Sequence, residues 1–337
     1  MTAILSCLQN THISIFHSAK PSPKTYSQVV ASSSMNQYQP IKTQFSSARQ
    51  LISDFPHLLR SQKEILSTVI SIADDSFGSL LHPSSLSVPP DVESYQNAAG
   101  SSLGFLNINR GVDASSVPSS SKSLFQFDSY FNWAALLQVD FLLTNCMHLT
   151  LPTGSIMNIV TLQGHLKPTT DAPHLVLEVC HFSPSNVLVC LDLTPRKDLI
   201  LHPEYLKEFY EEGGLEECRK AFYERIPEAE PYVSSSMHVR SVMSPTGILA
   251  MVKCGDRTEE ILREGVAPVA AEVVRIWAVN CARERRASEG ETRELERRDM
   301  MLKKKSVELD LAPKLPAIFG EDVANRVIRV ITNVYGT

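Results

Sequence analysis

The chain has 337 residues, of which 43% are hydrophobic and 20% charged, with a formal net charge of −5 at pH 7. This composition is ordinary for a globular protein and excludes a wholly disordered chain. The mildly acidic balance gives no reason to expect nucleic acid as a partner. The longest apolar runs, at 175–179 and 187–193, are far shorter than the roughly 20 residues that span a bilayer, so no integral membrane segment is expected.

The first 50 residues differ from the rest of the chain. Between Met1 and Arg49 there is no acidic residue, serine is abundant, and the first carboxylate is Asp54. This composition is typical of an organellar transit peptide, and the scarcity of arginine favours a plastid over a mitochondrion. A generic N-terminal tail is the alternative. We predict a plastid transit peptide over residues 1–50 and a single domain over residues 51–337.

The predicted domain opens with a helix. Ser53 and Asp54 offer a cap before Pro56, and apolar residues then recur at helical spacing to about Asp75. A short strand is predicted over residues 103–109. It is followed by a Ser-rich insertion at about 111–135, within which residues 115–123 are expected to form a surface loop.

Apolar, β-branched runs of strand length dominate the middle of the chain. Four strands are predicted, over residues 139–151, 156–166, 175–182 and 187–193. The links between them are short, which suits antiparallel hairpins because a parallel return needs a crossover of a dozen residues or more. Several strands are apolar on both faces, so we expect helices to cover both sides of the sheet.

The C-terminal half supplies those helices. They are predicted over residues 204–210, 215–225, 258–286, 289–305 and 321–334, with further strands over 237–243 and 248–253. The helix from residue 258 should bend near Pro268. The sequence therefore predicts an α/β fold, an α/β/α sandwich with a central antiparallel sheet flanked by helices on both faces.

Cysteine, glycine and histidine patterns give no sign of a resident cofactor. Seven cysteines are scattered without a Cys-x-x-Cys pair, so we expect reduced thiols and no metal site. No Gly-x-Gly-x-x-Gly and no phosphate-binding loop is present, so no flavin or nicotinamide site is expected. The histidines are spaced like neither a metal site nor a nucleophile–base pair. Electrons for any redox reaction would have to come from outside the chain.

Glu178 is the first candidate for chemistry because its neighbours are apolar. Strand alternation places it on one face with Val176 and Cys180. A carboxyl in such surroundings loses hydration, which favours its protonated form, and a protonated carboxyl can give a proton to a substrate. The alternative is structural. This face could meet solvent, or Glu178 could pair with Arg or Lys from a covering helix.

Two aspartates raise the same question. Asp192 lies in a similar apolar strand but close to its end at Pro195, so we expect a turn or salt-bridge role. Asp310 lies in an acidic–apolar alternation that leads to Pro313 and Pro316, and by itself it reads as a cap or loop residue.

Short basic stretches interrupt the acidic balance. They are Arg196-Lys197, Arg283 with Arg285 and Arg286, Arg297-Arg298, and Lys303-Lys304-Lys305. Such patches steer acidic protein partners. From residue 283 onwards they alternate with acidic residues, so a solvated helix with i,i+4 ion pairs is the alternative.

Several short motifs occur together in the order of a known family. They are Leu151-Pro152-Thr153-Gly154, Pro195-Arg196-Lys197-Asp198-Leu199, Pro203-Glu204-Tyr205-Leu206-Lys207-Glu208, Pro231-Tyr232-Val233-Ser234, Glu294-Leu295-Glu296-Arg297-Arg298-Asp299 and Phe319-Gly320-Glu321. As an ordered set they resemble the red chlorophyll catabolite reductases from about Asp140 to the C-terminus, with weaker similarity back to Phe55.

The resemblance implies the fold of the ferredoxin-dependent bilin reductases, a homodimer and a place in the chloroplast stroma. It implies reduction of red chlorophyll catabolite, an opened linear tetrapyrrole, to the primary fluorescent catabolite. Reduced ferredoxin would deliver single electrons, and no metal or organic cofactor would be bound. The family's two acidic catalytic residues fall on Glu178 and Asp310. Met243 falls where an apolar wall of the substrate pocket is expected, and Arg240 on the same segment is expected to bind substrate.

A non-catalytic protein that binds and sequesters the tetrapyrrole is the alternative function. A carrier has no need of paired buried carboxyls, whereas a reductase does. We therefore expect the tetrapyrrole to lie between one face of the sheet and the covering helices, near Glu178 and Asp310, with ferredoxin docking at a basic rim.

Overall fold

The computed structural model describes most of the chain after the predicted transit peptide. The described residues are 48–77, 82–83, 88–111, 138–151, 154–183, 185–282 and 287–336. Predictions for residues 1–47, for most of the Ser-rich insertion and for Arg283, Arg285 and Arg286 fall outside them.

One antiparallel sheet runs through the molecule. In the described part of the chain it has nine strands in the order β1-β3-β4-β5-β6-β7-β9-β8, with β2 also paired to β3. The strands are β1 (His82–Pro83), β2 (Ser94–Gln96), β3 (Leu103–Arg110), β4 (Val139–Thr150), β5 (Ile156–Leu166), β6 (His174–Ser183), β7 (Asn186–Thr194), β8 (Ala229–Pro231) and β9 (Ile248–Lys253). Strands β4 to β7 form the meander that the short links predicted, and the prediction is confirmed.

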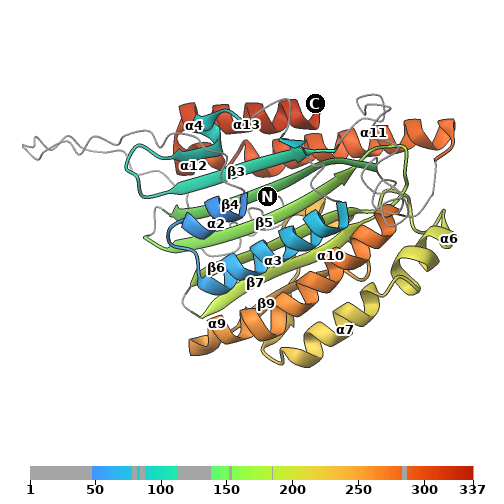
Figure 1. Cartoon of the computed structure of the whole chain (residues 1–337), viewed down its shortest axis with the longest axis horizontal. Coiled ribbons are helices and arrows are strands. Elements are labelled where there is room, and N and C mark those ends of the chain that lie inside the picture. Colours follow the sequence, from blue (N-terminus) through green and yellow to red (C-terminus); the bar gives the residue numbers. More distant parts are fainter. Residues whose placement is uncertain are drawn as a thin grey trace, which may run out of the picture.

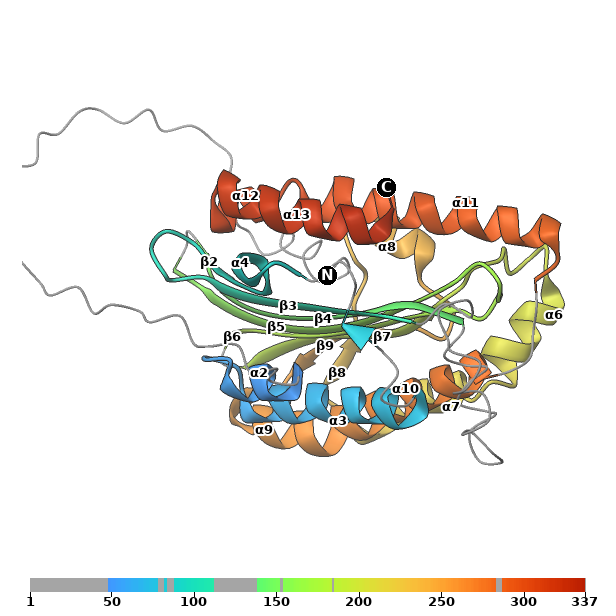
Figure 2. The same cartoon turned by 45° about the horizontal axis from the view of Figure 1, so that its top comes forward.

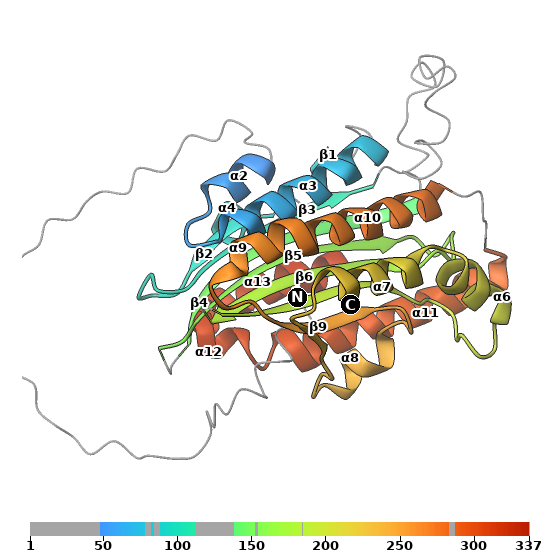
Figure 3. The same cartoon turned by 90° about the horizontal axis from the view of Figure 1, so that it is seen from below.

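Helices cover both faces of the sheet (Figure 1; Figure 2). One layer contains α2 (Ala48–Asp54), α3 (Arg60–Phe77), α7 (Leu215–Arg225), α9 (Thr258–Glu260), the π-helical η5 (Ile261–Val266) and α10 (Ala267–Ala282), and Figure 3 shows it from below. The other contains α4 (Pro90–Glu93), α8 (Met237–Val242), α11 (Glu289–Ser306), the π-helical η6 (Val307–Leu311), α12 (Leu315–Phe319) and α13 (Glu321–Tyr335). Two short segments, α6 (Pro203–Leu206) and η3 (Lys207–Glu211), lie at one end. The predicted α/β/α sandwich is confirmed.

Strand alternation divides the core between the two faces. On β6, Leu175, Leu177 and Val179 belong to the apolar cluster under α3 and α10. Val176 and Cys180 belong to the opposite cluster, under α11, α12 and α13. Glu178 lies on the same face of β6 as Val176 and Cys180. Its side chain therefore lies under the C-terminal helices.

The start of the domain differs from the prediction. Helix α2 ends at Asp54 and α3 begins only at Arg60, so Ser53 and Asp54 end one helix instead of capping the next. Phe55 precedes Pro56, which disfavours the helical conformation, and His57 has a positive φ of 68°. Ile52 of α2 is fully buried. A boundary at residue 50 would therefore fall inside a packed helix.

Residues 237–243 were expected to form a strand, and this prediction is wrong. They form the short helix α8, in which the Ser236 hydroxyl caps the N-terminus by accepting a hydrogen bond from the Val239 amide at 3.3 Å. Only Val239 of the helix is buried, so its six residues carry too short a pattern to separate the helical period from the strand period.

The irregularity expected near Pro268 takes the form of a π-helical segment. η5 ends at Val266, and α10 follows directly. Proline has no N–H to donate to the carbonyl four residues earlier, which explains why the regular ladder is interrupted just before Pro268.

Candidate functional site

The structure brings Glu178 and Asp310 together although 132 positions separate them in sequence. Glu178 lies in β6 and is 0% exposed, and Asp310 lies in η6 and is 1% exposed. Burial raises the pKa of Asp310 to about 6, the Lys314 ammonium opposes this rise, and the charge of Glu178 adds to it. The two carboxyls therefore interact through the interior of the protein. The solvent-facing alternative for Glu178 is wrong.

Asp310 was expected in a cap or loop, and this too is wrong. Helix α11 continues through Ser306 into η6, which carries Asp310 inward on a π-helical turn. The Lys314 ammonium donates a hydrogen bond to Asp310 Oδ1 at 3.3 Å. Lys314, in the turn between η6 and α12, thus forms an ion pair with Asp310.

Polar residues that the sequence analysis did not single out share the sheet face with Glu178. Asn145 on β4, with Thr161 and Gln163 on β5, is at least 98% buried there. Tyr335, from the end of α13, places its hydroxyl 3.4 Å from Gln163 Oε1. Burial and the charge of Glu178 together raise the pKa of this phenol. The missed signal was the alternation of polar residues at 161, 163 and 165 within an otherwise apolar strand.

His165 continues this polar row towards the α6 end of the sheet. Its ring stacks on Phe141 with centroids 4.6 Å apart and lies 4.7 Å from the ring of His174. Burial and the neighbouring His174 hold the pKa of His165 well below its ordinary value. The imidazole is therefore neutral near pH 7.

Met243 and Arg240 lie at different depths. Met243 follows α8 directly, is half-buried and packs against the same apolar cluster as Val176. Arg240, on α8, is exposed. The structure therefore brings Met243 to the Glu178 face of the sheet, whereas Arg240 lies at the surface.

Asp192 anchors the loop that carries Met243. Its carboxylate accepts hydrogen bonds from the Ser244 amide at 2.9 Å and from the Ser244 hydroxyl at 2.5 Å. Burial raises the pKa of Asp192 to about 6 although these hydrogen bonds oppose the rise. We expected a turn or salt-bridge role. In the described residues, its carboxylate accepts hydrogen bonds from Ser244, which precedes β9, and from the backbone of Leu193.

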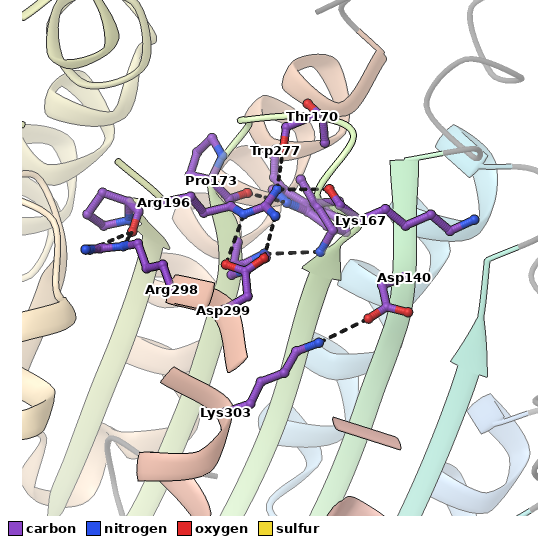
Figure 4. A network of polar contacts seen from close by, with 12 residues as sticks. Asp140, Lys167, Thr170, Pro173, Arg196, Trp277, Arg298, Asp299 and Lys303 are labelled. Carbon is purple, nitrogen blue, oxygen red and sulfur yellow. Dashed lines mark hydrogen bonds and ion pairs between the residues drawn. The ribbon is translucent and has the colours of Figure 1, made fainter. Parts of the chain in front are cut away.

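Two of the residues expected in a basic docking surface are buried in ion pairs. The Arg196 guanidinium donates two hydrogen bonds to the Asp299 carboxylate (Figure 4). The Lys303 ammonium donates a hydrogen bond to Asp140, with 3.1 Å between Nζ and Oδ2. His174 contacts the same Asp299 at 3.0 Å. These contacts tie α11 to the sheet.

The basic residues that stay exposed on α11 include Arg297 and Lys304. The Lys305 side chain is 43% exposed. A pocket of about 610 Å³ lies where α11 faces the segment between β7 and α6. It is lined by Lys197, Leu201, His202, Arg297, Met300 and Met301, among others.

The described residues contain neither a metal-binding group nor a disulfide nor a membrane-spanning helix. They contain no group of three or more His, Cys, Asp or Glu side chains that could hold a metal ion. The six cysteines among them are buried free thiols. In the same part of the chain, no helix is both long enough and apolar enough to cross a bilayer.

Known proteins resemble the chain in both sequence and fold. Residues 61–127 and 134–333 match the family described as red chlorophyll catabolite reductase (RCC reductase). The chloroplastic red chlorophyll catabolite reductase of Arabidopsis thaliana is 34% identical over 306 residues, which cover 89% of this chain and 88% of that protein. The chloroplastic red chlorophyll catabolite reductase 1 of Oryza sativa subsp. japonica is 36% identical over 283 residues, which cover 82% and 78%.

A solved structure supports the fold. Tomato phytochromobilin synthase, crystallised in complex with biliverdin, superposes with a TM-score of 0.58 over 81% of this chain and 83% of that chain, at 14% identity. The predicted bilin reductase fold is thereby confirmed. With a family match over most of its length and two relatives above 30% identity, the chain belongs to the red chlorophyll catabolite reductase family.

Proposed function

We propose that this protein reduces red chlorophyll catabolite to the primary fluorescent catabolite in chlorophyll breakdown, with electrons from reduced ferredoxin. The observation that carries the proposal is the buried pair of carboxyls, Glu178 and Asp310, in a chain of this family. Two electrons and two protons convert one double bond of the open tetrapyrrole into a single bond. Ferredoxin supplies the electrons one at a time, and the two carboxyls supply the protons.

The proton-donor role follows from the surroundings of the pair. A carboxyl acts as an acid only while it holds its proton, and a pKa near working pH suits that task. Asp310 has a pKa of about 6, and the neighbouring Glu178 disfavours two negative charges in the same interior. Asp310 is thus suited to hold its proton at pH values up to about 6, well above the ordinary range of an aspartate.

The substrate site is proposed between the sheet and the C-terminal helices. Met243 would form part of its apolar wall, and its flexible side chain could shape the face from which the double bond is protonated. Arg240 lies at the surface of α8 and would contact a charged or polar edge of the tetrapyrrole. No resident metal or organic cofactor enters this proposal, since the electrons come from ferredoxin.

The chain is a chloroplast protein, as its relatives are named. We propose that it works in the stroma as a homodimer and that its N-terminal segment is a transit peptide. The domain would begin no later than Ala48, because α2 packs Ile52 into the core. Sedimentation of the mature protein tests the dimer: a monomer at micromolar concentration would contradict it.

Anaerobic turnover of the protein and two variants tests the proton donors. Glu178→Gln and Asp310→Asn keep the size of each side chain but cannot release a carboxyl proton. We expect each to lower kcat by about 100-fold or more, the scale of general acid catalysis, with little change in substrate binding. Glu272→Gln, at an exposed ion pair on α10, is the control and should keep full activity. Undiminished turnover in both site variants would refute the assignment.

A further inference from the structure

Three side chains form a transverse row on the sheet face under the C-terminal helices. Asn145 on β4 is directly opposite Thr161 on β5, and Thr161 is directly opposite Glu178 on β6. Directly opposed side chains of antiparallel strands lie about 5 Å apart at Cβ. Asn145, Thr161 and Glu178 are each 0% exposed. The row therefore extends the Glu178 site across two more strands.

Two polar atoms of this row are buried without a partner. Within the described chain, neither Asn145 Nδ2 nor Thr161 Oγ1 has a hydrogen-bond partner. Asn145 does use its other end, since the Tyr95 hydroxyl lies 3.4 Å from Asn145 Oδ1. Buried polar groups are almost always hydrogen-bonded, and each exception calls for a reason. Two exceptions side by side, next to a buried carboxyl, indicate a ligand with polar groups.

The chemistry of these two atoms restricts that ligand. An amide nitrogen can only donate, so Asn145 Nδ2 requires an acceptor such as a carbonyl oxygen, whereas a hydroxyl can donate or accept. The walls around them are apolar, including Leu106 on β3, Ile159 on β5 and Phe319 at the end of α12. Apolar walls with a few convergent polar groups are typical of small-molecule sites, where those polar groups fix orientation.

We propose that Asn145 and Thr161 bind the polar edge of the tetrapyrrole and orient it against Glu178. Asn145 Nδ2 donates to a carbonyl oxygen of an end ring, and Thr161 Oγ1 bonds a pyrrole N–H or a carbonyl. The inference rests on the proposed function. Both residues are substrate-binding groups, and neither is assigned a proton transfer.

Removing each group without changing its size tests this role. Thr161→Val and Asn145→Leu should each raise the dissociation constant for red chlorophyll catabolite by about 3- to 10-fold, which corresponds to one hydrogen bond. The constant is measured by absorbance titration in the dark without ferredoxin. KM should rise by the same factor while kcat changes little. The thermal midpoint of Thr161→Val should not fall, because the variant buries no unsatisfied hydroxyl.

Matched variants separate binding from packing. Thr161→Ser keeps the hydroxyl and should bind as the wild type does. Thr144→Val removes a buried hydroxyl from β4 on the opposite face of the sheet, and it should leave the dissociation constant unchanged. Tyr95→Phe removes the phenol that meets Asn145 but keeps the amide, which controls for the loss of that contact in Asn145→Leu.

The outcomes distinguish this inference from the function on which it rests. Dissociation constants within about twofold of wild type for Thr161→Val and Asn145→Leu would overturn the inference, even if turnover is normal. If Asn145→Leu fails to fold, the comparison of Thr161→Val with Thr161→Ser is sufficient to test the inference. Tight binding by the wild type without turnover would contradict the reductase activity, and the titrations would still decide the role of this row.

Discussion

At Asp310, burial and a neighbouring carboxyl act against the charge of Lys314. Burial is the largest influence, and the result is a pKa of about 6 in place of the ordinary value of 3.8. Asp192, on the same face of the sheet, also has a pKa of about 6, but its carboxylate is occupied by Ser244. Two aspartates with the same pKa thus have different surroundings, and only Asp310 interacts with Glu178.

The pH dependence of turnover should report Asp310. An acid with a raised pKa keeps its proton below that value, so kcat/KM should be highest in acid and fall as the pH rises through about 6. The measurement is kcat/KM between about pH 5 and 8, with ferredoxin saturating. Asp192→Asn should keep the inflection, because it leaves the Asp310–Glu178 pair intact. If the inflection disappears in Asp192→Asn, the pH dependence arises from Asp192 and not from Asp310.

At the scale of elements, α11 is attached to the sheet by a buried ionic network. Although burial opposes it, contacts with His174 and Arg196 hold the pKa of Asp299 below its ordinary value. A lowered pKa means that this carboxylate stabilises the folded state at neutral pH, and that the contribution is lost as the pH falls below about 4. Since α11 leads into η6, the same network helps to position Asp310.

Asp299→Asn should destabilise the protein strongly. The change leaves the Arg196 guanidinium buried without its counter-charge, which costs about 3–5 kcal/mol in comparable cases. Urea unfolding at neutral pH measures the loss. Glu272→Gln breaks an exposed pair with Arg275 on α10 and should cost less than about 0.5 kcal/mol. Equal effects of the two changes would contradict a structural role for the buried network.

Close packing between β5 and α10 predicts a second stability difference. A Cβ on Gly164 would lie 2.4 Å from the ring of Trp277, a fully buried side chain whose indole donates to the Pro173 carbonyl. Gly164→Ala should therefore destabilise the protein by about 1–3 kcal/mol. Gly290→Ala in α11 meets open space and should be neutral or stabilise by up to about 1 kcal/mol. Chemical denaturation of both variants checks the difference in sign.

The sequence predicted the long elements better than it predicted the short helix α8 or the ion pairs between distant elements. The meander from β4 to β7 was readable because long apolar runs alternate with short links. Helix α8 was missed because one buried residue, Val239, gives no period. Arg196 and Lys303 looked exposed within basic runs, since their counter-charges Asp299 and Asp140 come from distant elements.

Only part of the candidate site could be predicted from the sequence. Glu178 was visible in sequence as a carboxylate within an apolar strand. Its neighbour Thr161 was not, because a neutral polar residue is common in strands and acquires meaning only from the register with β6. Tyr335 reaches Gln163 only because α13 folds back over the sheet, which no local pattern encodes.

At the scale of the whole molecule, the two faces of the sheet differ in character. The face under α3 and α10 is packed with apolar side chains around Trp277. The face under α11 to α13 combines an apolar cluster with buried carboxyls, amides and imidazoles. One face thus stabilises the fold and the other holds the candidate site. Ferredoxin would approach the layer that contains α11.

Exposed basic residues of α11 should therefore govern the encounter with ferredoxin. Lys304→Glu should raise the KM for ferredoxin several-fold at low salt, and the difference should shrink as salt shortens the Debye length to about 10 Å at 0.1 M. Lys220→Glu makes the same change on α7, in the opposite layer, and should leave this KM unchanged. Equal effects at both positions would show that only net charge matters.

A reductase, unlike a carrier, transfers electrons to the tetrapyrrole that it binds. A single-turnover reaction tests it most directly: the protein, loaded with red chlorophyll catabolite, is mixed anaerobically in the dark with excess reduced ferredoxin. Ferredoxin oxidation and product fluorescence are recorded together. We predict that two ferredoxins are oxidised for each fluorescent product formed. Bound catabolite that persists unchanged while ferredoxin stays reduced would rule out the reductase activity and identify a carrier.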